Sequence, residues 1–489
     1  MRGFCLILFS FIIIISSCKK DEISYDVSNK LDFSQESVVF DTVFTTIGSV
    51  TKYIKIYNRN NKKLIISNIN LSGGKNSNFK VNIDGTPGCS FENIEIYPND
   101  SLFVLVEVTV DPNNSNSPLV IMDSIMFSTN GNNQKVKLVA WGQDANYIIA
   151  NQYVGNLPYK VVAHENESVV WNNTKPYVIY GYAVVDSAAE LHIGAGTKIY
   201  FHKNSGLWVY KYGMLKVNGT LEEPVIFQGD RLDYDYRNIA GQWDRIWINE
   251  SNKTSEIKYA IIKNGFIGIQ AESLENRIDN QKLIIKNTII QNMSGIGLLS
   301  KNYAVSGYNL MVSNCGQYCV ALTMGGKYNF KNCTFANYWE STRNTPAFYL
   351  NNYVKVDNTT YTYPLDEANI ENSIIYGNLE NEIEISSNGG TFNYFIESCI
   401  LKTGPDSDIN TSNTTYFKNT IKNPSNIEID GASRNPIFND YGNNDFSLFN
   451  QSVAKDKANI DLLEINTYRD LKGNLRITAP DLGAIEFIE

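Results

Sequence analysis

YAIIKN (residues 259–264) is the first of four similar stretches, followed by NTIIQN (287–292), NLMVSN (309–314) and NCTFAN (332–337). Each has two strand-forming residues and then, two positions later, an Asn. The final Asn residues are 28, 22 and 23 positions apart. A period just above twenty with short strands is typical of one coil of a right-handed parallel β-helix. Weaker copies, ENSIIYGN (371–378) and ESCILKT (397–403), extend the series.

The recurring Asn, at positions 264, 292, 314 and 337, has two interpretations. It could form a row of ligand-binding amides, or an internal ladder that satisfies backbone groups at each bend, and the second is favoured because buried backbone groups need partners. Cys333 and Cys399 share one register, with Ser373 in the intervening copy. Two coils at ~4.8 Å each separate them too far for a disulfide, so both are expected to be buried thiols.

A different pattern precedes the repeats. YIKIY (53–57), FKVNI (79–83) and VLVEVTV (104–110) alternate polar and apolar residues, which indicates half-buried strands. Turn-forming clusters separate these strands and no helical period appears. Residues 31–147 are therefore expected to form an immunoglobulin-like sandwich.

The N-terminus indicates an exported lipoprotein. Arg2 precedes an apolar run, residues 4–15, that is too short for a ~30 Å hydrocarbon core and is typical of a signal peptide. The run ends in Ile-Ser-Ser-Cys18, which resembles the bacterial lipobox, in which cleavage precedes the Cys and its sulfur is acylated. An ordinary signal peptide with an incidental Cys is the alternative. Residues 1–17 are expected to be the signal and 18–30 the lipidated tether.

The amino-acid composition argues against several classes of function. The 42 Lys and Arg against 51 Asp and Glu give a net charge of −9, which argues against a nucleic-acid partner. Three histidines leave little material for a His-rich metal site or a Ser-His-Asp hydrolase. The 43% hydrophobic content is that of a folded chain rather than a disordered one.

Several segments resemble known families. The order of strand and turn segments in residues 48–142 resembles that of ASH-type immunoglobulin-like domains. Two later segments, GTLEEPVIFQGD (219–230) and DLKGNLRITAPDLGAIEF (470–487), are similar to segments of Bacteroidota surface lipoproteins with a pectate-lyase-like β-helix. KKDE (19–22) resembles the signal that sends such lipoproteins to the outer face of the outer membrane, so the protein is expected to face the cell exterior. The resemblance implies an all-β chain: an N-terminal sandwich, a right-handed parallel β-helix over 148–446, and a capping segment over 447–489 that covers unpaired strand edges.

Aromatic residues supply one candidate ligand site. Trp208, Tyr210 and Tyr212 alternate along one strand, and Trp243 and Trp247 lie about one coil later. Exposed rings can stack on sugar rings, because a flat apolar face matches a pyranose face. Packing under the loop at 230–241 is the alternative, since large aromatic side chains usually bury most of their area.

Acidic residues supply a second candidate. Asp230, Asp233 and Asp235 lie within six residues, and carboxylate oxygens are preferred calcium ligands. The stretch lacks the Gly and distal Glu of an EF-hand, so a solvated loop is the alternative. No carboxylate recurs at one register of the repeat, where Lys263, Gln291, Ser313 and Ala336 are expected to face solvent.

These observations favour a lipoprotein anchored in the outer membrane that binds a glycan or another surface partner without catalysis. A polysaccharide lyase or glycoside hydrolase of the pectate-lyase-like superfamily, and a purely structural envelope protein, are the alternatives; fold analogy alone supports the enzyme. We expect a membrane contact through the lipid, a polysaccharide partner, no nucleic acid and a monomer. No cofactor is required, apart from calcium at the acidic loop if that site is real.

Overall fold

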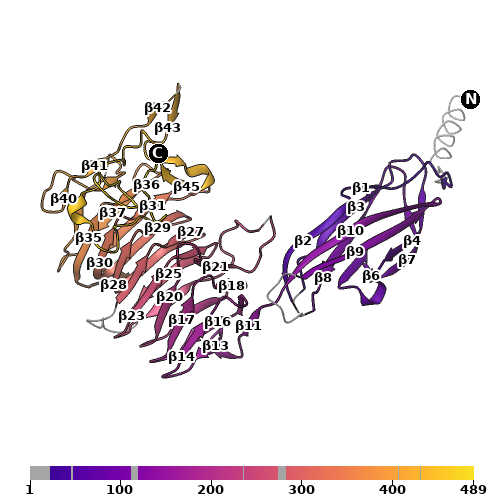
Figure 1. Cartoon of the computed structure of the whole chain (residues 1–489), viewed down its shortest axis with the longest axis horizontal. Coiled ribbons are helices and arrows are strands. Elements are labelled where there is room, and N and C mark those ends of the chain that lie inside the picture. Colours follow the sequence, from indigo (N-terminus) through magenta and orange to yellow (C-terminus); the bar gives the residue numbers. More distant parts are fainter. Residues whose placement is uncertain are drawn as a thin grey trace, which may run out of the picture. The chain divides into compact units, whose positions relative to one another are not determined.

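The computed structural model describes residues 22–45, 48–111, 119–234, 236–273, 282–405, 407–429 and 431–489. The expected signal peptide, Cys18 and Asp235 lie outside these residues. The described chain is all-β, as predicted, and contains no α-helix. Within it, no helix is long and apolar enough to span a bilayer. The chain forms two compact units, Met1–Ala145 and Asn146–Glu489 (Figure 1).

The first unit consists, in its described part, of two five-stranded sheets that enclose one apolar core. Within these two sheets, all strand pairings are antiparallel except that of β2 with β10. In sheet order the first contains β1 (Asp32–Phe33), β3 (Lys52–Tyr57), β8 (Ser101–Val108), β5 (Phe79–Ile83) and β6 (Thr86–Gly88). The second contains β2 (Ser37–Phe44), β10 (Asn132–Gln143), β9 (Leu119–Thr129), β4 (Leu64–Leu71) and β7 (Ser90–Ile96).

The period-two pattern predicted these strands correctly. In β3, Ile54 and Ile56 are fully buried while Tyr53 is exposed. In β8, alternate valines point into the same core and their neighbours face out. The alternation arises because successive side chains of a strand point to opposite faces of its sheet.

The second unit contains long parallel sheets. An 11-stranded sheet, counted over the described residues, is parallel throughout. Its strands in order are β11 (Asn146–Ile149), β15 (Tyr177–Tyr180), β18 (Lys198–Phe201), β21 (Val225–Gly229), β24 (Ala260–Lys263), β27 (Ile289–Met293), β29 (Met311–Cys315), β31 (Thr334–Asn337), β36 (Ile374–Gly377), β39 (Ile400–Leu401) and β41 (Ile421–Lys422). The quoted repeats are β24, β27, β29 and β31.

The other strands of the stack form an 18-stranded sheet, again counted over described residues, that is parallel except at β12. Long strands β28 and β30 join two parallel series within it. Its members are β12 (Gln152–Val154), β13 (Leu157–Ala163), β14 (Ser168–Trp171), β16 (Tyr182–Val185), β17 (Glu190–Gly194), β19 (Gly206–Val209), β20 (Met214–Asn218), β22 (Ile246–Asn249), β23 (Thr254–Lys258), β25 (Ile267–Glu272), β26 (Lys282–Lys286), β28 (Ile296–Tyr308), β30 (Val320–Lys331), β32 (Phe348–Asn351), β35 (Leu365–Glu371), β37 (Ile383–Ser386), β38 (Phe395–Glu397) and β40 (Phe417–Lys418).

Each repeat thus contributes one strand to the first sheet and one to each series of the second, and one apolar core lies between the sheets. In each quoted repeat the residue just before the one expected to face solvent is fully buried: Ile262, Ile290, Val312 and Phe335. Such columns bury apolar area that no single repeat could bury alone.

The cysteines are free thiols, and all five in the described residues lack disulfides. The backbone N–H of Cys333 donates to Ser373 Oγ at 3.0 Å, and the N–H of Ser373 donates to Cys399 Sγ at 3.4 Å. The predicted order Cys333, Ser373, Cys399 is therefore confirmed. Burial raises the pKa of the Cys333 thiol to about 12.

Three hairpins and three short 3-10 helices complete the described elements. The hairpins are β33 (Tyr353–Val356) with β34 (Thr359–Thr362), β42 (Ile427–Ile429) with β43 (Ala432–Arg434), and β44 (Phe438–Asp440) with β45 (Asp445–Leu448). The 3-10 helices are η1 (Gly74–Asn76), η2 (Tyr441–Asn443) and η3 (Ile460–Leu462).

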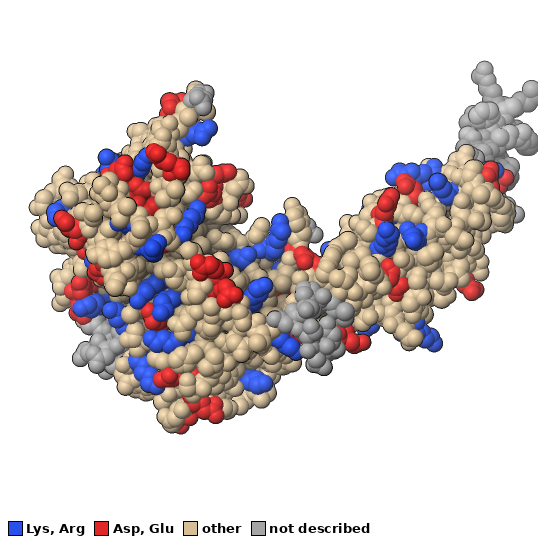
Figure 2. Space-filling model, in the orientation of Figure 1, with Lys and Arg blue, Asp and Glu red and all other residues tan. Residues whose placement is uncertain are grey.

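Charged side chains of both signs are interspersed over the visible face of each unit (Figure 2). Several form pairs along the sheets. Lys286 Nζ lies 3.0 Å from Glu256, and Lys331 Nζ lies 2.9 Å from Glu371.

Candidate functional site

The outer face of the 11-stranded sheet is covered by the C-terminal part of the chain. Lys263, Gln291, Ser313 and Ala336 form one outward column, as their pairing shows. We expected all four to face solvent, but Ser313 and Ala336 are fully buried. Apolar residues of the C-terminal segment, residues 437–489, pack on this face; they include Ile437, Phe438, Phe446, Leu471 and Ile485.

Polar contacts fix this C-terminal segment to the sheet. Asn309 Nδ2 donates to the Arg469 carbonyl at 2.7 Å. Asn372 Oδ1 accepts from the N–H of Asn459 at 2.8 Å, and its Nδ2 donates to the Asn459 carbonyl at 2.9 Å. We expected residues 447–489 to cover a strand edge, but these contacts lie along the sheet face. The segment therefore forms a wall over β27–β36.

A buried arginine holds this wall. The guanidinium of Arg476 donates to Glu486, to the Gly483 carbonyl at 2.9 Å and to Asn309 Oδ1 at 3.2 Å. Burial raises the pKa of Glu486 to about 7, although Arg476 opposes that shift. Burial likewise raises the pKa of Asp481, whose oxygens accept two backbone N–H groups. The buried Arg476 is thus the cation that interacts with the carboxylates of Glu486, Asp470 and Asp481.

A second buried arginine holds the loop between β31 and β32. Both nitrogens of the Arg343 fork reach Glu382, at 2.7 and 2.8 Å, and the two side chains are 1% and 0% exposed. Arg343 also donates to Asn378 Oδ1 at 2.7 Å. The loop at 338–347 is therefore pinned from within, and its outer residues project beside the C-terminal segment.

A polar cavity of about 360 Å³ lies between this loop and the C-terminal segment. We call it the amide cavity, because six amide side chains line it: Asn238, Asn264, Gln291, Asn292, Asn314 and Asn444. Tyr338, Trp339, Glu340, Ser341 and Tyr441 complete most of its lining. The ring of Tyr338 stacks on that of Tyr441 with centroids 4.1 Å apart, which joins the loop to the C-terminal segment.

Three polar groups of the amide cavity are free to bind a ligand. The Gln291 amide, the Trp339 indole N–H and the Glu340 carboxylate make no hydrogen bond with the described part of the chain. Gln291 and Trp339 are half-buried, so each lies at the wall rather than in open solvent. Partly desolvated donors and acceptors without partners favour a polar ligand.

The recurring Asn residues combine both interpretations. Asn292 Nδ2 donates to Asn264 Oδ1 at 2.8 Å and to the Asn238 carbonyl at 2.6 Å, while Asn337 bonds the backbone of Cys315. Asn314 donates instead to Asn444. Some of these side chains therefore form hydrogen bonds with backbone groups at the bends, and Asn264 and Asn292 also contact each other. Three of the four, Asn264, Asn292 and Asn314, line the amide cavity.

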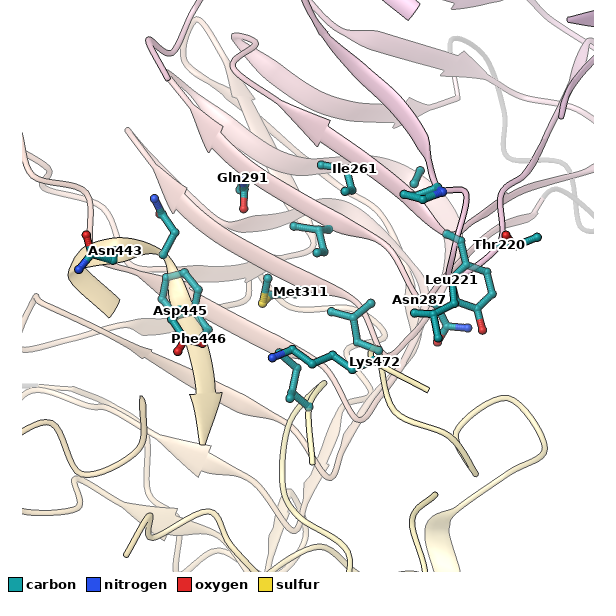
Figure 3. A pocket seen from close by; sticks show the side chains of 17 residues that line it. Thr220, Leu221, Ile261, Asn287, Gln291, Met311, Asn443, Asp445, Phe446 and Lys472 are labelled. Carbon is teal, nitrogen blue, oxygen red and sulfur yellow. The ribbon is translucent and has the colours of Figure 1, made fainter. Parts of the chain in front are cut away.

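A second, mostly apolar cavity of about 420 Å³ adjoins the first (Figure 3). Gln291 and Asn444 line both cavities. In Figure 3, Ile261, Gln291 and Met311 come from neighbouring strands, while Asn443 and Phe446 face them from the C-terminal segment. We call this the apolar cavity.

The predicted aromatic residues do not form an open sugar platform. Trp243 is 1% exposed and stacks on Phe201 at 4.4 Å, so it belongs to the core and was wrongly included. Trp208 and Trp247 stack on each other at 4.8 Å, and each covers one face of the other. Tyr210 packs edge-on against Trp208 at 5.3 Å, whereas Tyr212 is 44% exposed.

The indole N–H groups of that pair are also already bonded. Trp208 Nε1 donates to Asn249 Oδ1 and Trp247 Nε1 donates to Glu272 Oε1, both at 2.7 Å. This leaves neither indole with the free donor that Trp339 has. Lateral packing, the alternative considered for these residues, therefore describes Trp208 and Trp247 better than ligand stacking does.

Each described carboxylate of the acidic loop is paired with a basic side chain. Asp230 Oδ2 lies 2.7 Å from His202 Nδ1, and Asp233 Oδ2 accepts from Arg231 Nε at 3.1 Å. Asp235, the third predicted ligand, lies outside the described residues. Over the described chain, no group of three or more His, Cys, Asp or Glu side chains is arranged to hold a metal ion.

His202 provides a pH-dependent test of this loop. Its hydrogen bond to Asp230 raises the pKa of His202, so the stabilising pair is present below pH ~6.5 and is lost as pH rises through the raised pKa. We expect Asp230→Asn to lower the pKa of His202, measured by NMR of histidine-labelled protein. Calcium bound at Asp230 would lower it in the unchanged protein. An unaltered pKa in the variant would contradict this pairing.

Sequence reasoning missed Trp339, Glu340, Asn444 and the Asn that begins the second, third and fourth quoted repeats. That first Asn adopts positive φ at 287, 309 and 332, and two of these residues lie in contact: Asn309 Nδ2 donates to Asn287 Oδ1 at 2.8 Å. Its recurrence was visible in the quoted motifs. The unusually long interval between Asn337 and Asn378 also indicated an inserted loop, whereas Asn444 carried no such signal.

Comparisons with known proteins establish no family. No family model matches the chain, and no curated protein matches it. Among solved structures, a family 123 glycoside hydrolase from Clostridium perfringens, described for glycolipid glycan hydrolysis, is 11% identical over 22% of this chain, with a TM-score of 0.17. The match spans 23% of the hydrolase, so this chain covers about a quarter of that protein.

A second structure, the ASH/PapD-like domain 7 of human CEP192, is also 11% identical with a TM-score of 0.17. That match covers 26% of this chain and 92% of the human domain. Both scores are too low to carry an argument about activity.

Proposed function

We propose that this protein is a non-catalytic, glycan-binding lipoprotein of the outer membrane, and that the amide cavity is its binding site. The observation that carries the proposal is the pair of half-buried polar groups without hydrogen-bond partners among the described residues, the Gln291 amide and the Trp339 indole N–H, beside the exposed Glu340 carboxylate. Sugar hydroxyls both donate and accept, and amide side chains do the same. A mixed aromatic and amide lining therefore suits a sugar better than an ion.

The acid content of the cavity favours binding over hydrolysis. Glu340 is the one carboxylate among the described residues that line it. Glycoside hydrolysis ordinarily uses a pair of carboxylates on either side of the scissile bond. A hydrolase or lyase remains an outcome of the test below rather than the proposal.

The proposal includes the β-helix architecture, the immunoglobulin-like spacer and the lipid anchor on Cys18. We infer that the stacked three-strand repeats form a right-handed parallel β-helix and that the first unit is an immunoglobulin-like spacer. Parallel pairing between successive repeats and the shared core of the two antiparallel sheets support this inference. A lipid on Cys18 would hold the protein at the outer membrane, where the spacer precedes the binding unit.

Replacing Trp339 with alanine should weaken glycan binding about tenfold or more, because a tryptophan at a binding centre typically contributes over ~1.4 kcal/mol. The protein, beginning at Lys19, is tested against neutral and acidic polysaccharides by retention and calorimetry, with polymer size measured in parallel. Trp208→Ala is the matched control, since its indole N–H bonds internally to Asn249.

The outcomes separate the candidate sites. Loss of binding in Trp339→Ala but not in Trp208→Ala supports the amide cavity. The reverse pattern would return the site to the predicted aromatic strand. Shortened polymer would replace the binding function with an enzymatic one.

A further inference from the structure

The apolar cavity has walls from three separate parts of the chain. Ile261, Ile289 and Met311 face outward from neighbouring strands β24, β27 and β29. Leu221 closes one side, and Phe446 and Leu471 of the C-terminal segment close another. The cavity of about 420 Å³ is therefore a built space between sheet and segment rather than a dent in a flat surface.

The two cavities are neighbours with opposite chemistry. They share Gln291 and Asn444, so one wall separates an amide-rich space from a hydrocarbon-rich one. On β27, Ile289 faces the apolar cavity alone, whereas Gln291, two residues later on the same face, lines both. A polar ligand of the amide cavity that carried an apolar substituent at this wall would extend directly into the apolar cavity.

We propose that the ligand is amphiphilic: a sugar occupies the amide cavity, and an alkyl or acyl chain attached to it occupies the apolar cavity. This inference rests on the proposed function and adds a second part to the ligand. Binding of the chain would be favourable because it leaves water and packs against apolar side chains such as Ile261 and Met311. A chain without a sugar would leave the free Gln291 amide unused.

Alkyl glycosides test the inference without any substitution. Methyl, hexyl, octyl and decyl β-glucosides and β-maltosides are titrated below their micelle concentrations and followed by calorimetry. We expect the dissociation constant to fall by about three- to fourfold per methylene until the cavity is filled. Octanol, which has the chain without the sugar, should bind at least tenfold more weakly than the octyl glycoside.

A space-filling variant tests where the chain lies. Ile261→Trp adds volume inside the apolar cavity and should abolish the dependence on chain length while leaving methyl-glycoside affinity unchanged. Ile226→Trp is the matched control, because Ile226 pairs with Ile261 on the adjacent strand but does not line the cavity. The control should retain the full dependence.

Each result discriminates between the two proposals. Methyl glycosides that bind with no gain from longer chains would overturn the amphiphile and leave the glycan site intact. Octanol that binds as well as octyl glycoside, with no binding of methyl glycosides, would overturn both. Equal effects of Ile261→Trp and Ile226→Trp would also overturn the inference, since the chain would then lie elsewhere.

Discussion

Replacing Arg343 with methionine is expected to lower the free energy of unfolding of residues 146–489 by about 3–5 kcal/mol, the usual cost of removing one partner of a buried ion pair. Glu382, fully buried, would lose both hydrogen bonds from the guanidinium. The backbone N–H groups of Ala347 and Leu379 would still donate to it but could not replace the cation. The loop bearing Trp339 would lose its internal anchor, so glycan binding should fall as well.

Urea unfolding followed by tryptophan fluorescence measures this loss, since five of the six tryptophans lie in the second unit. Lys327→Met is the matched control: Lys327 pairs with Glu367 at 3.0 Å, but the two side chains are 61% and 39% exposed. Such a surface pair contributes about 0–1 kcal/mol. An Arg343→Met effect no larger than that of the control would contradict the anchoring role.

Replacing Arg476 with methionine should release the C-terminal segment from the sheet. The expected loss is again about 3–5 kcal/mol, because the change leaves Glu486 and Asp481 without their cation in a buried site. Glu486 already has a pKa raised to about 7 and can take up a proton. A raised carboxyl pKa makes stability fall as pH rises from the unfolded pKa of 4.5 towards 7, so the variant should be less stable at pH 8 than at pH 5.5.

Limited proteolysis and hydrogen exchange over residues 437–489 measure the release. Arg469→Met provides the control, since Arg469 lies on the same segment, is exposed and donates to the Gly473 carbonyl. We expect rapid cleavage in Arg476→Met and near-normal protection in Arg469→Met. Unchanged protection in both would show that apolar packing alone holds the segment.

The sequence predicted which residues of each repeat point inward, because strand periodicity and recurring apolar pairs depend on local pattern. Ser373 was correctly placed between Cys333 and Cys399 in this way. The same pattern placed Ser313 in solvent. It could not reveal the C-terminal segment over Ser313, because that contact joins residues far apart in the chain.

The candidate site was largely beyond prediction for the same reason. The Asn column was recognised, but its role in lining a cavity depends on Trp339 from an inserted loop and on Asn444 from the C-terminal segment. The Trp208 strand has a composition that suits sugar binding, but its pairing with the next strand stacks Trp208 on Trp247, which agrees with the packing alternative. Ring type predicts affinity for sugars only when the ring face stays open.

Residues 338–347 line part of the amide cavity and residues 437–489 line part of both cavities, and both segments lie outside the repeating strands. Strand register is fixed independently by the inward columns, so either segment can change in length or composition without moving the stack. Exchanging these two segments between two proteins of this fold should therefore exchange their ligand preferences. Each segment would have to include its own buried arginine, Arg343 or Arg476. The repeating strands would stay the same while the ligand preference changed with the two segments.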